Sequence, residues 1–324
     1  MNYLSGCNPQ MPQISLRENL SKIGEPKPGT TTIHIPSGFH TAPKSLKAMI
    51  HSMNSPKMES WAAKCEDHQA DSRWTFECQG ITTDGKYWYA VNNNNHKPGA
   101  MGIFRFNIDY GDLKYRRWPS NPNNHVGPPS YFDKKIYVPV ETGDAPLVWI
   151  LDTELTTLDL AALRGTELSG QHKKMPWCAI NPWNGLLYSS RFGGGEDDPV
   201  PVSEVHCYDP AKSFDFKKSL KLQSLPISEV QGGCFSSNGH LYLTSGDEHI
   251  HGYSVLNGSY LGSFHVPSDW TGAEEMEGIA IGNIPCKDTD VHVPVHVLVL
   301  DNDHPRTDSD IWLKHIADPA QEIL

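Results

Sequence analysis

Polar and ionisable side chains recur at one kind of position in this sequence, at the start of a short apolar segment that contains glycine. Gln79, Gln231 and Glu277 each directly precede a glycine, and His125 lies two residues before one. Buried groups of this kind must be hydrogen-bonded to one another, to trapped water or to a ligand. They also suit acid–base chemistry, with His125 as the general base and with Gln79 and Gln231 stabilising developing charge.

Oxygen-bearing side chains follow the most apolar stretch of the chain. Asp301, Asn302 and His304 come directly after residues 295–300, which are valine, leucine and histidine only. Carboxylate and amide oxygens suit hard cations, so Glu277, Asp301 and Asn302 are the predicted ligands of Ca²⁺ or another divalent cation. His304 is an alternative general base. The same run also fits a turn, because Asp and Asn favour turns.

Four further side chains are predicted to bind the substrate. One begins an apolar segment, and the other three follow the second apolar segment of a repeated unit. An indole, a guanidinium, an amide and a carboxyl group can together hold a small polar molecule. These residues are Trp177, Arg191, Asn93 and Glu141.

A histidine pair gives a second metal pattern. His249 and His251 alternate, which places both imidazoles on one face of a strand, and Asp247 lies nearby. These groups could bind zinc, although solvated histidines on a strand face give the same pattern. The sequence contains no nucleophile elbow or phosphate-binding loop, so no nucleotide cofactor is expected.

These residues fall at fixed positions of an internal repeat that occurs five times between about residue 67 and the C-terminus. Each copy has an apolar segment, a polar turn, a second apolar segment, a loop and a third apolar segment. Turns such as Asp84-Gly85 and Asn184-Gly185 supply the positive φ that tight hairpins need. The copies start at Gln79, His125, Trp177, Gln231 and Glu277, with spacings of 46, 52, 54 and 46 residues.

The repeat predicts an all-β fold, a β-propeller with five visible four-stranded blades. Spacings of about 50 residues are typical of a propeller blade, and a radial array protects its strand edges. A sixth, degenerate blade built from the first 66 residues is the alternative. A β-sandwich would not explain a fixed three-strand unit. A parallel α/β fold would need helices where the linkers are polar or rich in proline and glycine.

The chain before the repeats is predicted to be an N-terminal extension over residues 1–66, with the propeller over residues 67–324. A helix is expected near residues 41–53, because a threonine can cap it and its apolar residues form one stripe. Residues 30–35 are expected to supply the outer strand that the last copy lacks, which would close the ring.

In such a ring the innermost strands line a central channel. The starts of these strands and the loops after the second strands are expected at its two rims. The rim residues differ from one copy to the next. This difference favours one unique site at a channel mouth over a site repeated in every blade.

Charge and cysteine content limit the class of partner. The chain has 27 Lys and Arg against 38 Asp and Glu, a net charge of −11 that repels nucleic acid. No apolar run is long enough to cross a bilayer, so no membrane partner is expected. Seven cysteines and the lack of an apolar leader favour the cytoplasm, with secretion open if a leader has been removed. The sequence does not indicate an oligomeric state.

The strand start Glu277-Gly278-Ile279 and the strand end Asp301-Asn302 resemble those of the propeller group that includes gluconolactonase-like, paraoxonase-like and strictosidine-synthase-like proteins. The resemblance covers the repeat region only. It implies a divalent ion held by Glu, Asn and Asp at the channel mouth, and hydrolysis of lactones or esters or other small-molecule chemistry there. The neutral amides of Gln79 and Gln231 at equivalent starts depart from that pattern.

The sequence therefore predicts an enzyme that processes a small-molecule substrate in one cup at the channel mouth. The first hypothesis is hydrolysis of a lactone or ester with help from a divalent metal. The second is a metal-free isomerase, lyase or cyclase that uses the same cup. A carbohydrate-binding propeller and a protein-interaction propeller, both without catalysis, are the remaining alternatives.

Overall fold

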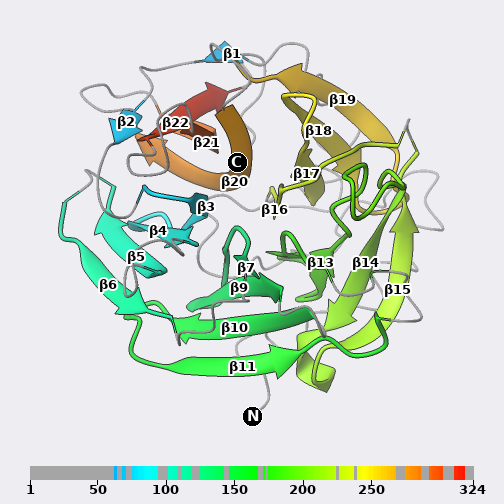
Figure 1. The fold of residues 1–324 in the computed structure, drawn as a ribbon, viewed down its shortest axis with the longest axis horizontal. Helices are drawn as coiled ribbons and strands as arrows, with labels where there is room; N and C mark the ends of the chain where they lie inside the picture. Colours follow the sequence, from blue (N-terminus) through cyan, green and yellow to red (C-terminus); the bar gives the residue numbers. More distant parts are fainter. Residues whose placement is uncertain are drawn as a thin grey trace, which may run out of the picture.

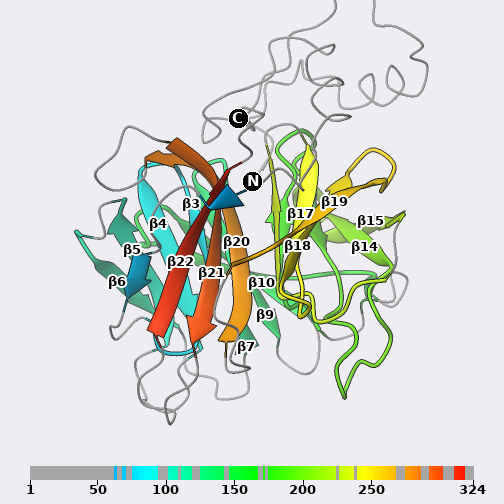
Figure 2. The same ribbon diagram turned by 90° about the horizontal axis from the view of Figure 1, so that it is seen from above.

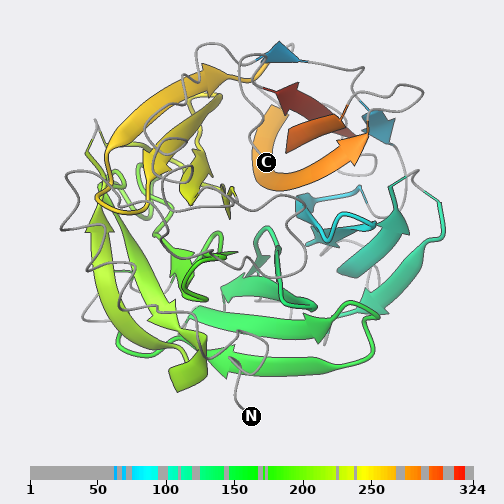
Figure 3. The ribbon, with the colours of Figure 1, turned by 180° about the vertical axis from the view of Figure 1, so that it is seen from behind.

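Five antiparallel β-sheets stand around a common axis and form a ring (Figure 1). Seen edge-on in Figure 2, the inner strands run roughly along the axis, and Figure 3 shows the same ring from behind. Each sheet fills four strand positions, so the predicted five-bladed β-propeller is confirmed. The computed structural model describes residues 62–63, 68–70, 75–93, 101–108, 111–118, 125–141, 146–166, 171, 174–223, 226–236, 239–267, 274–285, 292–301 and 310–317.

Three blades consist of four strands in sequence order from the axis outwards. The strands of blade 1 are β3 (Cys78–Thr83), β4 (Tyr87–Asn92), β5 (Gly102–Asn107) and β6 (Lys114–Arg117). Those of blade 3 are β12 (Ala179–Ile180), β13 (Leu187–Ser189), β14 (Glu204–Asp209) and β15 (Asp215–Lys221). Those of blade 4 are β16 (Gly232–Phe235), β17 (His240–Thr244), β18 (His249–Ser254) and β19 (Tyr260–His265).

The inner strand of blade 2 is divided in two. Pro128 and Pro129 interrupt it because proline has no N–H to donate to the neighbouring strand. Both pieces pair with the same second strand. The strands of blade 2 are β7 (His125–Val126), β8 (Ser130–Phe132), β9 (Lys135–Glu141), β10 (Pro146–Asp152) and β11 (Leu158–Ala162).

Blade 5 joins strands from the two ends of the chain. Its inner three strands are β20 (Glu274–Pro285), β21 (His292–Asp301) and β22 (Asp310–Ala317). The outer position is shared by β1 (Ala62–Ala63) and β2 (His68–Ala70), which both run antiparallel to β22. Backbone pairing between N-terminal and C-terminal strands therefore closes the ring. The strand predicted at residues 30–35 and the helix predicted near residues 41–53 lie outside the described residues.

The hairpin turns adopt the backbone conformation that their residues predicted. Gly85 and Gly185 have φ of 84° and 64°, in the left-handed region that glycine enters without steric cost. Asp133 and Lys134, between β8 and β9, have φ of 46° and 61°. Two successive positive φ values match the twist of the flanking strands, so each turn fixes the register of its hairpin.

The apolar core is divided into five clusters of buried side chains, each between two adjacent blades. In one of them Trp88 of blade 1 packs with Leu298 of blade 5. In another Trp177 of blade 3 packs with Leu241 of blade 4. Because every blade buries both faces, the sequence shows apolar runs rather than strict alternation.

Close backbone packing around the axis explains why glycine recurs at the strand starts. A Cβ atom on Gly278 would lie 3.0 Å from the Cα of Gly80, and one on Gly232 would lie 2.9 Å from the Cα of Gly278. A Cβ atom on Gly127 would lie 1.8 Å from the carbonyl oxygen of Pro176. These contacts join blade 5 to blades 1 and 4, and blade 2 to blade 3, at the centre of the ring.

One expectation about the rims is wrong. The starts of the inner strands and the ends of the second strands lie at the same mouth of the channel, because these strands are antiparallel. His125 pairs with Glu141, and Glu274 pairs with Asp301. Both groups of residues therefore lie at the same mouth of the channel. Within the described part of the chain, no helix is long and apolar enough to cross a membrane.

Candidate active site

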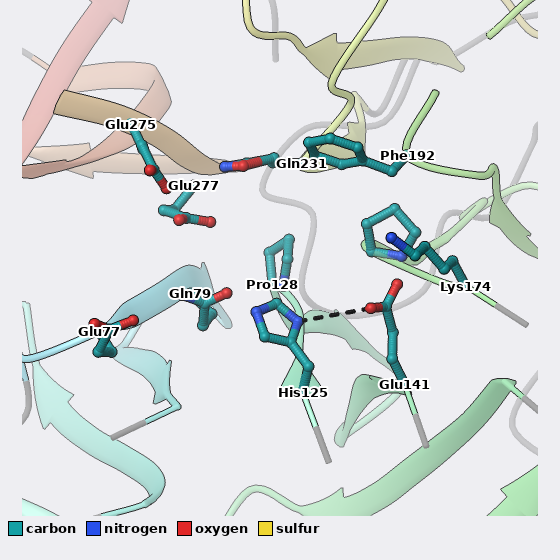
Figure 4. Close-up of a pocket in the computed structure, with 11 residues that line it drawn as sticks. Glu77, Gln79, His125, Pro128, Glu141, Lys174, Phe192, Gln231, Glu275 and Glu277 are labelled. Carbon is teal, nitrogen blue, oxygen red and sulfur yellow. Dashed lines mark ion pairs between the residues drawn. The ribbon is translucent and has the colours of Figure 1, made fainter. Parts of the chain in front are cut away.

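A cavity of about 330 Å³ lies at one end of the axis, where the inner strands begin. We call it the cup. All five blades contribute to its wall, so residues far apart in the sequence converge there (Figure 4). The lining residues are Glu77, Gln79, His125, Pro128, Glu141, Lys174, Pro176, Phe192, Gln231, Glu275 and Glu277.

Irregular strand pairing directs two of these side chains into the cup. In blade 1 the pairing of β3 with β4 skips Gln79, and in blade 5 the pairing of β20 with β21 skips Glu277. A residue that is skipped in this way forms a bulge, which turns its side chain out of the regular alternation. The glycine after each bulge lets the backbones of the two blades approach one another. The Gln-Gly and Glu-Gly pairs thus position one functional side chain each.

Glu277 is the most buried acid of the cup, with 5% of its surface exposed. Its pKa lies well above the ordinary value because burial disfavours the carboxylate, and the nearby charges of Glu275 and Glu77 add to this effect. Gln231 donates a hydrogen bond to Glu277, which opposes the rise. The raised pKa favours the protonated carboxylic acid, which is the form that can donate a proton.

His125 lies opposite this acid in the same cup (Figure 4). Burial within the cup and the nearby charge of Lys174 lower its pKa from 6.5 to about 4. Nearly half of the side chain, 48%, is still accessible to water. His125 is therefore a neutral imidazole at neutral pH, and it can accept a proton from a molecule in the cup.

Glu141 forms the wall beside His125. Its Oε1 accepts a hydrogen bond of 3.0 Å from the backbone N–H of Met175. Its other oxygen lies 3.9 Å from Nδ1 of His125, a contact that becomes an ion pair only when the imidazole is protonated. Burial raises the pKa of Glu141, and Lys174 partly opposes this rise. Glu141 can thus stabilise the imidazolium that forms when His125 accepts a proton.

The structure brings five of the sequence-predicted residues to the cup and places three others elsewhere. Trp177 is fully buried between blades, where its Nε1 donates to Ser190. Arg191 forms an ion pair of 2.7 Å with Asp198. Asn93 is buried at the end of β4 and does not line the cavity. The residues that do reach the cup are Gln79, His125, Glu141, Gln231 and Glu277.

Of the two predicted metal ligands that the structure describes, only Glu277 lines the cup. Asp301 ends β21 opposite Glu274 and lies outside the lining, and Asn302 and His304 lie outside the described residues. Among the residues that the structure describes, no group of three or more His, Cys, Asp or Glu side chains is arranged to hold a metal ion.

The histidine pair of blade 4, His249 and His251, is likewise not part of a metal-binding group among the described residues. His251 contacts Asp247, with its Nε2 at 3.1 Å from Oδ1, and His249 contacts the same residue. His265 contacts Glu248 through a separate pair of 3.1 Å. Their ring nitrogens thus have hydrogen-bond partners within blade 4, on strands outside the cup.

Sequence reasoning missed Glu77, Lys174 and Phe192 as parts of the cup. A signal for the first was present, because the pattern Glu-x-Gln/Glu-Gly occurs at the starts of three blades, at residues 77–80, 229–232 and 275–278. In the first and third copies the initial glutamate lines the cup. Lys174 and Phe192 have no such repeat, and only the folded chain reveals them.

No protein-family model and no curated protein matches the sequence. Among solved structures, the chain is similar to the crystal structure of the glutaminyl cyclase from Myxococcus xanthus, with a TM-score of 0.52. The two chains are 11% identical, and the match covers 79% of this chain and 95% of the other. At this identity the similarity establishes a shared β-propeller fold and nothing about activity.

Proposed function

We propose that this protein is an enzyme that cyclises a small amine-bearing molecule in the cup by acid–base catalysis. One observation carries the proposal. A carboxyl group whose pKa is raised, Glu277, and an imidazole whose pKa is lowered, His125, line the same cavity. Environments that push two titratable groups in opposite directions are typical of an acid and a base at one site.

The charge of the cup favours an amine as the nucleophile. Four glutamates and one lysine line it. Glu77 and Glu275 lie on the side of the cup that carries Glu277, whereas Lys174 lies on the opposite side (Figure 4). A cationic amine would be attracted to the acidic side, because its positive charge offsets the mutual repulsion of the glutamates there.

The reaction can be written with these groups. The bound ammonium first loses one proton to water, and the resulting neutral amine attacks an amide carbonyl of the same molecule. A C–N bond forms, and His125 accepts the proton that the nitrogen then loses. The amide side chain of Gln79 can donate a hydrogen bond to the developing oxyanion. Glu277 then protonates the leaving nitrogen, the original C–N bond breaks, and ammonia departs. Transfer of the proton from His125 to Glu277 through water restores both groups.

The reaction of the similar protein suggests what to assay first. The Myxococcus xanthus protein is a glutaminyl cyclase, and cyclisation of an N-terminal glutamine with release of ammonia is the kind of step described above. We expect the purified protein to release ammonia from glutaminyl-glycine. Glu277→Gln should lower kcat by about 100-fold or more, the usual contribution of a general acid. EDTA should leave the rate unchanged.

Glu229→Gln is the matched control. Glu229 begins the second copy of the Glu-x-Gln/Glu-Gly pattern, but its carboxylate lies against Gly246, outside the cup. Glu229→Gln makes the same substitution in the same fold and should retain full activity. Equal turnover in Glu277→Gln and Glu229→Gln would overturn the proposal.

Metal-assisted hydrolysis of a lactone or ester is the competing function. It depends on Asp301 and Asn302 joining Glu277 around a divalent cation. This alternative predicts turnover of δ-valerolactone that EDTA abolishes and Ca²⁺ restores. Such a result, together with no ammonia release, would replace the cyclase proposal.

A further inference from the structure

We propose that Phe192 determines substrate selectivity by contacting an apolar group next to the amine, and that Arg191 positions it instead of binding substrate. This inference rests on the proposed function only in assuming that the ligand binds in the same cup. Phe192 is half-buried, and its ring lies beside the Gln231 side chain (Figure 4). A ligand bound at the acidic wall would have this ring as its neighbour.

The surroundings of Phe192 make its ring the natural apolar contact. Apart from the ring and two prolines, Pro128 and Pro176, every lining side chain that the structure describes carries a carboxyl, amino, amide or imidazole group. An aromatic face adds binding free energy beyond that of buried area alone, most of all with another ring. It also attracts a cation held near it.

Backbone hydrogen bonds fix the loop that carries this ring. The carbonyl oxygen of Phe192 accepts from the N–H of Val230 at 3.0 Å. The next carbonyl, of Gly193, accepts from the N–H of Glu229 at 2.6 Å. Glu229 and Val230 directly precede Gln231, so the loop is tied to the segment that carries a cup residue. The position of the ring relative to Gln231 is therefore built into the fold.

Arg191 and Asp198 tie the two ends of the same loop together. Their side chains form an ion pair of 2.7 Å and are only 21% and 14% exposed. The second oxygen of Asp198 accepts from the N–H of Gly193 at 3.0 Å. One carboxylate thus binds both the guanidinium that precedes Phe192 and the backbone that follows it. A geometry of this kind holds the ring in place and leaves Arg191 outside the cup lining.

Glycines make this tight loop sterically feasible. Gly193 and Gly194 have φ of 71° and 83°. A Cβ atom on Gly194 would lie 2.4 Å from the Cβ of Ser228, and one on Gly193 would lie 2.8 Å from a side-chain carbon of Val202. The path of the loop thus explains the first two of the three glycines at residues 193–195, and a Cβ atom on the third would lie 3.1 Å from the Phe192 ring.

Two amines test the selectivity directly by calorimetry, without any need for turnover. Benzylammonium and methylammonium carry the same charge, but only the first has a ring. We expect the wild-type protein to bind benzylammonium about tenfold more tightly. Phe192→Ala should bring the ratio of the two dissociation constants close to one by weakening benzylammonium alone. Phe192→Leu, which keeps an apolar side chain in the loop, should give an intermediate ratio and serves if Phe192→Ala does not fold.

A double-mutant cycle separates positioning from ligand binding. Arg191→Ala and Asp198→Ala should each lower the benzylammonium-to-methylammonium preference. The double variant should lower it no further than Asp198→Ala alone, because Arg191 acts through its ion pair with Asp198. Arg191→Lys should restore part of the preference. Additive effects of the two substitutions would overturn the positioning role of Arg191.

The test of Phe192 selectivity can fail or succeed independently of the test of the proposed function. An unchanged ratio in Phe192→Ala would overturn the selectivity inference whatever the assay of ammonia release gives. Glu277→Gln should keep the wild-type ratio while losing turnover. Loss of turnover without loss of selectivity thus supports both claims, and turnover that persists in Glu277→Gln overturns the proposed function alone.

Discussion

At the scale of single residues, the surroundings of a glutamate decide how readily its carboxyl group ionises. Glu77, Glu275 and Glu277 are chemically identical, yet only Glu277 is nearly fully buried, with the other two close to it. Two carboxylates cannot both ionise easily at short range in a place that water barely reaches. Burial and the two neighbouring carboxylates therefore raise the pKa of Glu277, which suits it to the role of general acid that we propose.

Replacement of Glu277 by glutamine should stabilise the protein at alkaline pH. A carboxyl group whose folded pKa is raised binds its proton more tightly in the folded state than in the unfolded one. The free energy of unfolding then falls as pH rises from about 4.5, the ordinary value, through the raised pKa. Glu277→Gln removes this loss, so its melting temperature should exceed that of the wild type at pH 9. A melting temperature that falls below the wild-type value at that pH would contradict the burial argument.

His125 should make the protein sensitive to mild acid. Its folded pKa is lowered to about 4, so the unfolded chain binds a proton more readily below pH 6.5. Stability attributable to this residue is complete above pH 6.5 and is lost as pH falls toward 4. The loss is smaller than the full shift implies, because nearly half of the side chain meets water. Urea denaturation at pH 4.5 and 7.5 should show a smaller pH effect in His125→Gln than in the wild type.

At the scale of strands, bulges and glycines position the side chains that face the cup. Gln79 and Glu277 face the cup because their strands skip one residue of pairing. The glycines that follow allow adjacent inner strands to approach to distances at which a Cβ atom would collide. Replacement of such a glycine therefore affects both the packing of the ring and the geometry of the cup.

Gly127 offers the sharpest test of this packing. A Cβ atom there would lie 1.8 Å from a backbone oxygen of blade 3, which cannot rotate away. We expect Gly127→Ala to destabilise the protein by about 3 kcal/mol or more, at the upper end for overpacking. Gly111→Ala is the control, because its nearest atom would be 3.6 Å away. Gly111→Ala should change the free energy of unfolding by less than about 0.5 kcal/mol. Equal melting temperatures of Gly127→Ala and Gly111→Ala would refute the close backbone approach at the axis.

Closure of the ring is a property of the whole molecule. β1 and β2 pair with β22, so strands from opposite ends of the chain complete blade 5. Backbone donors and acceptors on the outer edge of β22 would otherwise meet only solvent. The cup depends on this closure, because Glu275 and Glu277 belong to blade 5 and face residues of blades 1 and 2.

Two truncations should differ in stability for this reason. Removal of residues 1–60 keeps β1 and β2, whereas removal of residues 1–71 deletes both. We expect the longer deletion to melt several degrees below the shorter one, since each kcal/mol lost shifts the midpoint by a few degrees in a chain of this size. Equal midpoints would show that blade 5 does not need its outer strand.

The sequence by itself determined the class of fold and much of the cup. Hairpin turns, glycine spacing and apolar runs act locally, so five copies of one pattern predicted five similar sheets. The inner-strand starts were predicted as the site, and Gln79, His125, Gln231 and Glu277 do lie there. The Glu-x-Gln/Glu-Gly pattern at the starts of three blades also indicates Glu77.

Only the tertiary structure decided which side chains face one another and in what state of charge. Trp177 and Arg191 looked like ligand-binding groups, but packing between blades buries the first and an ion pair occupies the second. Phe192 and Lys174 enter the cup from loops whose paths no local pattern specifies. The protonation of Glu277 depends on burial and on charges brought from other parts of the chain. These effects are set by distances through space, which separation along the sequence does not encode.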